Sequence, residues 1–165
     1  MTDWVALTAV WAGRQMRFVP DETPINAPRP CYVVVLISDG AGRYLLAHIR
    51  ERGYCAPSGR IEPGETPEAA AYREAYEESG AVVSRMHLLG HYLLEPCSTA
   101  EPEPCSAPVF LAQAARLEPL RPDSESQGVL WARLEEMPAL YHDWSPLIEA
   151  VFHYAEERRE ALWER

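Results

Sequence analysis

Hydrophobic residues occur along the chain in short runs that polar or Pro-rich segments separate, a pattern typical of a protein rich in β-strands. The run at 31–38, CYVVVLIS, is almost entirely apolar and β-branched, as expected of a strand buried on both faces. The turn DGAG follows, and then 43–50, RYLLAHIR, which we predict to be the second strand of a hairpin. Further strands are predicted at 81–94, 109–117 and 129–134.

The pattern before these strands predicts a separate N-terminal element. Residues 4–20, WVALTAVWAGRQMRFVP, predict two strands joined at Gly13, and the Pro-rich stretch 21–30 predicts a connector. We therefore divide the chain into an N-terminal hairpin extension, 1–30, and a main domain, 31–165.

Two segments carry helix signals. Over 67–79 the residues are rich in Ala and Glu, Thr66 can cap the N-terminus, and Gly80 suits the position after the last turn. A second helix is predicted to begin near Ser145, which is followed by Pro146 at the first helical position. Helices at two separated places among many strands predict an α+β fold with a sheet held between helices.

The 67–79 helix carries three carboxylates close together. At about 100° per residue, Glu74, Glu77 and Glu78 share one face, where they repel one another, and Arg73 can compensate Glu77 in part. The predicted core face on the other side consists of Ala69, Tyr72, Ala75 and Tyr76. The carboxylates can form a solvated acidic face, or a site for Mg²⁺ or Mn²⁺, which prefer oxygen ligands.

The wider spacing favours the metal site. The residues concerned are Gly59, Glu65, Arg73, Glu74, Glu77, Glu78 and Gly80. Their spacing resembles the Nudix box of the Nudix hydrolase family, G-x5-E-x7-R-E-U-x-E-E-x-G-U, in which U is a bulky aliphatic residue. The two U positions depart from that pattern because they hold the small residues Ala75 and Ala81.

The resemblance implies an α/β/α sandwich with a mixed central sheet. It also implies hydrolysis of the pyrophosphate of a nucleoside diphosphate linked to another moiety X, with Mg²⁺ or possibly Mn²⁺ as cofactor. The implied metal ligands are the Gly59 carbonyl, Glu74, Glu77 and Glu78. Glu74 would be a ligand or the catalytic base, and Arg73 would orient Glu77.

Two further acidic residues carry roles by resemblance. Glu65 would support the loop before the helix. Glu125 lies in DSESQGVLW, before a late strand, where family members often place an additional catalytic acid; the alternative is an ordinary loop glutamate.

The loops after the box favour ADP-ribose or an NDP-sugar as substrate. Pro96 lies 15 residues after Ala81, and Glu101 follows it by five, as in the ADP-ribose branch of the family. The alternatives are nucleoside triphosphates, oxidised ones included, and dinucleoside polyphosphates. A more remote alternative is an inactive Nudix-fold regulator that binds a nucleotide.

Aromatic residues and the N-terminal hairpin complete the predicted site and assembly. The side chains that could stack a base are Tyr54, Tyr92 and Trp131, although aromatic residues of this kind are more often part of the core. The N-terminal hairpin resembles the one that ADP-ribose enzymes use to dimerise, so we expect a homodimer.

Composition limits the partners. The chain has 165 residues and a formal net charge of −10, which disfavours binding to nucleic acid or to an anionic membrane. Its four cysteines form no C-x-x-C pair, so neither a zinc site nor a disulfide framework is expected. The start carries an acidic residue where a signal peptide would be basic, and no run approaches a membrane span, so we expect a cytoplasmic protein.

Overall fold

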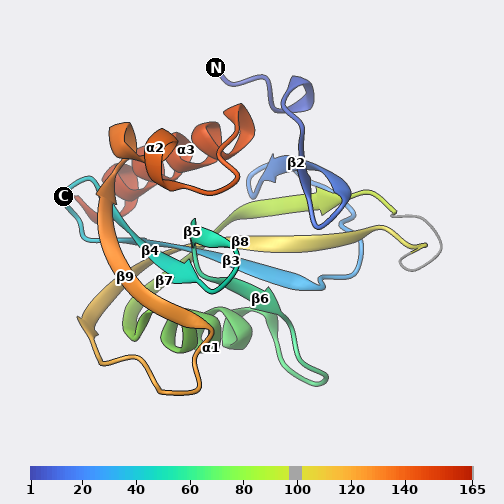
Figure 1. The fold of residues 1–165 in the computed structure, drawn as a ribbon. Helices are drawn as coiled ribbons and strands as arrows, with labels where there is room; N and C mark the ends of the chain where they lie inside the picture. The colour runs from blue at the N-terminus through green and yellow to red at the C-terminus, as the bar shows by residue number, and fades with distance from the viewer. Residues whose placement is uncertain (97–101, 165) are drawn as a thin grey trace.

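The computed structural model describes residues 1–96 and 102–164, and within them a single mixed sheet lies between two helices (Figure 1). The strands are β1 (Ala9–Trp11), β2 (Arg14–Pro20), β3 (Tyr32–Ser38), β4 (Arg43–Ile49), β5 (Gly53–Cys55), β6 (Ser58–Arg60), β7 (Ala81–Leu94), β8 (Cys105–Leu117) and β9 (Ser126–Arg133). The helices are η1 (Trp4–Ala6), α1 (Pro67–Ser79), η2 (Leu134–Glu136), α2 (Met137–Leu140) and α3 (Pro146–Trp163).

The sheet runs in the order β1-β2-β7-β8-β3-β4-β5, with β6 paired to β3 and β9 paired to β4. β3 and β8 pair in parallel, and the other strand pairs of the described residues are antiparallel. Figure 1 shows α1 on one side of the sheet and α3 on the other. The predicted α/β/α sandwich with a mixed central sheet is therefore confirmed.

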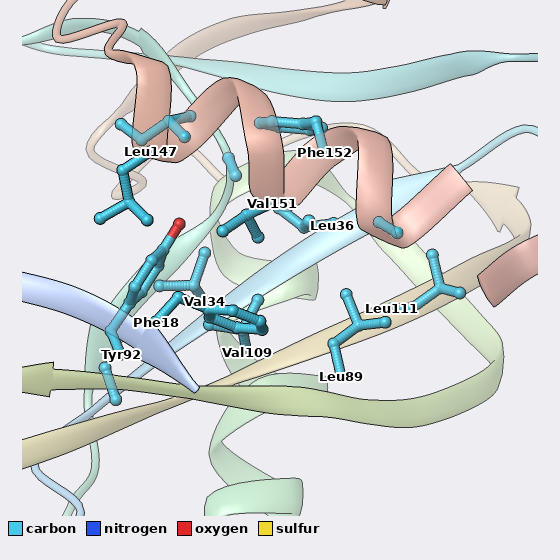
Figure 2. Close-up of a cluster of buried hydrophobic side chains, with 14 of the residues drawn as sticks. Phe18, Val34, Leu36, Leu89, Tyr92, Val109, Leu111, Leu147, Val151 and Phe152 are labelled. Carbon is cyan, nitrogen blue, oxygen red and sulfur yellow. The ribbon is translucent and has the colours of Figure 1, made fainter. Parts of the chain in front are cut away.

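Strand β3 lies in the middle of the sheet and contributes side chains to the core on both of its faces. Val34 and Leu36 point into the core beneath α3, whereas Val33, Val35 and Ile37 point into the core beneath α1. This alternation of a fully apolar strand is what the sequence 31–38 predicts. Figure 2 shows the α3 side, where Phe152 and Val151 of the helix lie over the sheet.

Helix α1 begins and ends where the capping residues predict. Thr66 Oγ1 accepts a hydrogen bond from the Ala69 N–H at 3.1 Å, and Pro67 takes the first position. Gly80 has a left-handed backbone with φ of 75°, and its N–H donates to the Tyr76 carbonyl at 2.8 Å. Ser145 caps α3 in the same way through the Ile148 N–H.

The predicted core face of α1 is wrong for two of its members. Tyr72 is 40% exposed and Ala69 is exposed too, whereas Ala75 is fully buried. Glu74 and Glu78 lie on the buried side instead, at 8% and 6% exposure. The physical reason is that this side of the helix meets both the sheet and a cleft, so carboxylates and alanines share it.

The N-terminal segment joins the main sheet. The first of the two strands predicted over 4–20 is shorter than expected, because residues 4–6 form a 3₁₀ turn and β1 covers only three residues. Strand β2 pairs with β7, and its Phe18 is fully buried against Tyr92. The domain division at residue 31 stays a prediction.

Short strands extend the sheet beyond the sequence pattern. β5 and β6 lie where the sequence predicts no strand, and β8 and β9 begin earlier than predicted, at Cys105 and Ser126. Pairing with long neighbours explains this, since Cys105 lies opposite Leu94 at the end of β7. Among the described residues, no helix combines the length and apolarity needed to span a membrane.

Candidate active site

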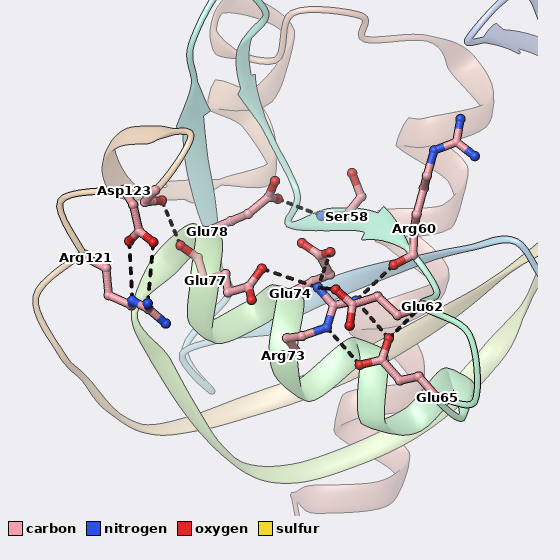
Figure 3. Close-up of polar contacts among 11 residues, drawn as sticks. Ser58, Arg60, Glu62, Glu65, Arg73, Glu74, Glu77, Glu78, Arg121 and Asp123 are labelled. Atoms are coloured by element: carbon pink, nitrogen blue, oxygen red, sulfur yellow. Dashed lines mark hydrogen bonds and ion pairs between the residues drawn. The ribbon is translucent and has the colours of Figure 1, made fainter.

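The Arg73 guanidinium organises the acidic face of α1 (Figure 3). Its Nε and Nη2 each donate to Glu65 at 2.8 Å, and its Nη1 donates to Glu74 at 2.7 Å and to Glu77 at 3.3 Å. Nη2 also donates to the Arg60 carbonyl at 2.9 Å, which ties α1 to β6. These hydrogen bonds lower the pKa of Glu65 to about 2, so Glu65 is a fixed anion that holds Arg73 in place.

Glu78 is a buried carboxylate with little compensation. Its Oε1 accepts the Ser58 N–H at 2.8 Å, where the start of β6 meets the last turn of α1. Burial raises its pKa to about 8, the nearby charge of Glu74 adds to the rise, and the Ser58 hydrogen bond opposes it. A neighbouring cation would favour the ionised form of this group.

Glu74 lies against the backbone of Gly59. A Cβ at position 59 would overlap the Glu74 carboxylate, so any other residue there would push the end of that flexible side chain out of its present place. Burial also raises the pKa of Glu74, although its hydrogen bond from Arg73 works in the opposite direction. Glycine at this position therefore serves the placement of a carboxylate.

Glu125 reaches the same cleft from another element. It precedes β9, and its carbonyl accepts the Arg50 N–H at 3.0 Å. The neighbouring Ser124 Oγ donates to the Glu77 carbonyl at 2.8 Å, which fixes this loop against the end of α1. The charge of Glu125 is one of the causes that raise the pKa of Glu78, so the two carboxylates are close enough to interact.

These carboxylates face one open cleft of about 900 Å³. It brings together the predicted residues Gly59, Arg73, Glu74, Glu77, Glu78 and Glu125. It is also lined by residues that sequence reasoning missed: Trp11, Tyr32, Arg52, His142 and Asp143. Their positions in the chain carry no shared spacing, so no sequence signal could have grouped them.

A second, apolar recess adjoins the cleft, and Trp11 and Asp143 border both. Its walls include Tyr92, one of the aromatic residues considered for base stacking, and Tyr141, which the sequence pattern did not indicate. The Tyr141 hydroxyl accepts a hydrogen bond from the Ala56 N–H at 3.0 Å. The recess therefore offers an aromatic surface next to the carboxylates.

Four other predicted substrate residues lie elsewhere or cannot be placed. Tyr54 is in β5, stacked on His48 at 4.6 Å between ring centroids, and does not line the cleft. Trp131 packs against the core on the α1 side. Pro96 is exposed just after β7 and does not line the cleft, and Glu101 lies outside the described residues.

The residues around α1 fit a hard divalent cation in donor chemistry. All the side-chain donors are carboxylate oxygens, as Mg²⁺ and Mn²⁺ prefer. The hydrogen bonds of Glu74 and Glu78 within the described residues use one oxygen of each, which leaves the second oxygen for a ligand. As they stand, no three His, Cys, Asp or Glu side chains of the described residues are close enough together to surround an ion.

Comparison with known proteins agrees with this geometry. The family model of the NUDIX domain matches residues 28–152, and the chain therefore belongs to the Nudix hydrolase family. A crystal structure of the Bacillus subtilis pyrophosphohydrolase BsRppH, an E68A mutant, superposes with a TM-score of 0.71 at 25% identity. That match covers 92% of this chain and 94% of the other.

Two curated relatives are similar in sequence. A Bacillus subtilis protein named as the 8-oxo-dGTP diphosphatase YtkD is 42% identical over 72 residues, which is 44% of this chain and 44% of that protein. The oxidized purine nucleoside triphosphate hydrolase of Mus musculus is 31% identical over 127 residues, 71% of this chain and 78% of the mouse protein. The first match thus spans less than half the length of its relative.

Proposed function

We propose that this chain is a divalent-metal-dependent pyrophosphohydrolase of nucleoside triphosphates, with an oxidised purine nucleotide as the favoured substrate. The observation that carries the proposal is the direct connection between the carboxylate cleft of α1 and the aromatic recess. A triphosphate would lie over the carboxylates while its base reaches the recess. The names of the relatives from Bacillus subtilis and Mus musculus support the same substrate class.

Asp143 supplies a polar contact suited to an oxidised purine. Its Oδ1 is buried and has no hydrogen-bond partner among the described residues, although His142 Nδ1 lies 3.4 Å away. A carboxylate accepts hydrogen bonds only, so it fits N–H groups on the edge of a base. Oxidation of a purine to its 8-oxo form converts N7 from an acceptor to an N–H donor, which increases the number of such groups.

ADP-ribose, the substrate that the sequence pattern favoured, has weaker support. The residues that suggested it are Pro96, which does not line the cleft, and Glu101, which lies outside the described residues. The relatives favour the triphosphate alternative. We therefore rank nucleoside triphosphates above ADP-ribose and NDP-sugars.

Each residue of the site has a proposed role that follows from its position. Arg73, held by Glu65, would orient Glu77 and Glu74. Glu74, Glu77, Glu78 and the Gly59 carbonyl would hold Mg²⁺ or Mn²⁺, which neutralises phosphate charge and acidifies water when bound. Glu125 or Glu74 would accept the proton of the attacking water.

The test is a comparison of kcat/KM for 8-oxo-dGTP, dGTP and ADP-ribose with Mg²⁺ and with Mn²⁺, with products separated by chromatography. We expect the nucleoside monophosphate and pyrophosphate from 8-oxo-dGTP, at a kcat/KM at least about tenfold above that for ADP-ribose. Asp143→Asn should reduce the preference for 8-oxo-dGTP over dGTP, because the amide has an NH₂ donor in place of one of the two acceptor oxygens. A higher kcat/KM for ADP-ribose would contradict the proposal.

The predicted homodimer remains a proposal. Phe18 and Met16 of the N-terminal hairpin are buried within the chain's own core, so Val5 and Val10, at 76% and 67% exposure, are the apolar side chains that a partner could cover. Light scattering of the wild type and of a Val5→Asp, Val10→Asp double variant tests this. Equal masses for both proteins would argue against the hairpin as the interface.

A further inference from the structure

The turn of the N-terminal hairpin forms one wall of the cleft. Trp11 is the last residue of β1, and the turn that follows it uses left-handed backbone at Ala12 and Gly13, with φ of 52° and 75°. Val10, Trp11 and Ala12 all line the carboxylate cleft. This segment lies before residue 28, where the match to the family begins, so the wall comes from outside the shared domain.

The Trp11 indole packs against the Tyr32 ring, which in turn contacts the Arg60 guanidinium. Its ring centroid is 5.1 Å from that of Tyr32, at an interplanar angle of 56°. The Arg60 guanidinium carbon lies 5.1 Å from the Tyr32 ring centroid. Tyr32 and Arg60 are direct partners in the antiparallel pairing of β3 with β6, so both residues are fixed in the central sheet. The indole is thereby attached to the strand that carries Gly59.

Trp11 occupies the junction between the two parts of the site. It lines both the carboxylate cleft and the apolar recess. It is only half-buried, although a tryptophan that served packing alone would gain from complete burial. A planar aromatic surface beside a phosphate-binding site is the arrangement that stacks a nucleobase, since every base has a π-face.

We propose that Trp11 is a specificity-determining residue on which the base of the nucleotide stacks, so that the N-terminal hairpin completes the substrate site. The inference rests on the proposed function, because it assumes that a nucleotide occupies the cleft. The base would stack on the indole while its phosphates lie over Glu74, Glu77 and Glu78. Asp143, which lines the recess together with Trp11, would then contact the edge of the same base.

The experiment compares Trp11→Leu with Trp11→Phe by calorimetry in Mg²⁺, with 8-oxo-dGMP and inorganic pyrophosphate as probes. We expect Trp11→Leu to raise the Kd for 8-oxo-dGMP about tenfold and to leave that for pyrophosphate unchanged. Trp11→Phe should recover most of the affinity, because it keeps a π-face. With 8-oxo-dGTP as substrate, KM should rise while kcat changes by less than about twofold, as for a group that binds ground and transition states equally.

Trp4→Phe is the matched control, because Trp4 belongs to the same segment but packs against Phe18 and Tyr154. It should leave both affinities unchanged. Thermal unfolding of each variant verifies that the hairpin is still folded. Should Trp11→Leu melt early, its affinities are measured below its melting temperature, and an affinity for 8-oxo-dGMP unchanged in the folded Trp11→Leu protein overturns the inference.

Failure of the inference is distinguishable from failure of the proposed function. A wild type that hydrolyses no nucleoside triphosphate refutes the function, whatever Trp11 does. A wild type that hydrolyses 8-oxo-dGTP with Trp11→Leu equal to it refutes the role of Trp11 alone. A parallel loss of pyrophosphate affinity in Trp11→Leu would also refute it, because it would show a general distortion of the cleft.

Discussion

Helix α1 packs on the sheet through small side chains, whereas α3 packs on it through large ones. On α1 the contacts are made by Ala70, Ala71 and Ala75, each fully buried. On α3 they include Phe152, whose ring meets that of Tyr44 edge-on at 5.3 Å between centroids. Because the distance between packed elements depends on the side chains at the contact, alanines let α1 lie close to the sheet. The cluster of buried apolar residues on the α3 side is the larger of the two, so its burial should contribute more to stability.

The two sides also treat buried charge differently. On α3, Arg159 is buried but forms ion pairs with Glu156 and Glu164. On α1, Glu74 and Glu78 are buried with raised pKa values, and the hydrogen bond that Glu78 accepts comes from the Ser58 N–H rather than from a cationic side chain. Ionisable groups with strongly shifted pKa values are concentrated at functional sites. We therefore propose that the chemistry takes place on the α1 side, whereas the α3 side mainly supplies stability.

The largest expected effect is that of Glu78→Gln on turnover. Removal of this charge should lower kcat for 8-oxo-dGTP by at least about a thousandfold, because Gln is a poorer ligand for a hard cation. Glu149→Gln, an exposed change on α3, should leave kcat unchanged. Metal-dependent turnover of Glu78→Gln at the wild-type rate would break the assignment of chemistry to α1.

The same variant should stabilise the metal-free protein at high pH. The pKa of Glu78, about 8, is above its ordinary 4.5, so between these values the native state holds a proton that the unfolded chain has released. Wild-type stability therefore falls as the pH rises from 4.5 to 8. In EDTA at pH 8 the Tm of Glu78→Gln should exceed that of wild type by at least about 4 °C, and the difference should vanish near pH 4.5. A Tm below wild type at pH 8 would contradict the raised pKa.

Phe152→Ala should have the largest effect on stability. Removal of this fully buried ring should lower the free energy of unfolding by about 3–5 kcal/mol, measured by urea denaturation. At a temperature well below its Tm, kcat should remain within about twofold of wild type, whereas KM should rise because Phe152 also lines the apolar recess. A large loss of kcat in the folded variant would show that the α3 side takes part in positioning the site.

Ala75→Leu tests the opposite side by overpacking. The added volume should cost about 1–3 kcal/mol, less than Phe152→Ala, but it should displace α1 and reduce kcat by at least about tenfold. The measurements are urea denaturation and steady-state kinetics on the same preparations. If kcat followed stability in both variants alike, the distinction between the two sides would be lost.

The smallest effects are expected at the helix caps. Thr66 and Ser145 each accept one backbone N–H, at 3.1 and 3.2 Å, so Thr66→Ala and Ser145→Ala should each cost about 1 kcal/mol. Equal costs would show that the two caps stabilise their helices equally. The helices would then differ only in the side chains that they pack against the sheet. A cost near zero at either site, again by urea denaturation, would show that its cap hydrogen bond is not formed in solution.

Local signals made α1 and its motif predictable. Thr66, Pro67 and Gly80 act within one turn of the helix ends, and the spacing from Gly59 to Glu78 spans neighbouring elements of the chain. Such short-range patterns survive in the sequence because they require little tertiary context. The strand pattern was readable for the same reason, since β3 is apolar on both faces.

The rest of the site depends on tertiary packing. Tyr141 and Asp143 reach the recess because the segment before α3 pairs with β5, where the Tyr54 carbonyl accepts the His142 N–H at 3.0 Å. Trp11 reaches it because β2 pairs with β7. Contacts between residues so far apart in sequence leave no periodicity or spacing to read. The substrate prediction was weak for a related reason, since one proline at a suitable distance in a Pro-rich loop places no side chain in the cleft.

The most direct test of the account is Mn²⁺ binding, measured by electron paramagnetic resonance at pH 7.5. The central claim is that the carboxylates on the closely packed side of α1 hold the cation. Wild-type protein should bind Mn²⁺, and Glu78→Gln and Glu74→Gln should each weaken binding at least about tenfold, whereas Glu149→Gln should bind as wild type does. Equal Mn²⁺ affinity in all four proteins would contradict the claim.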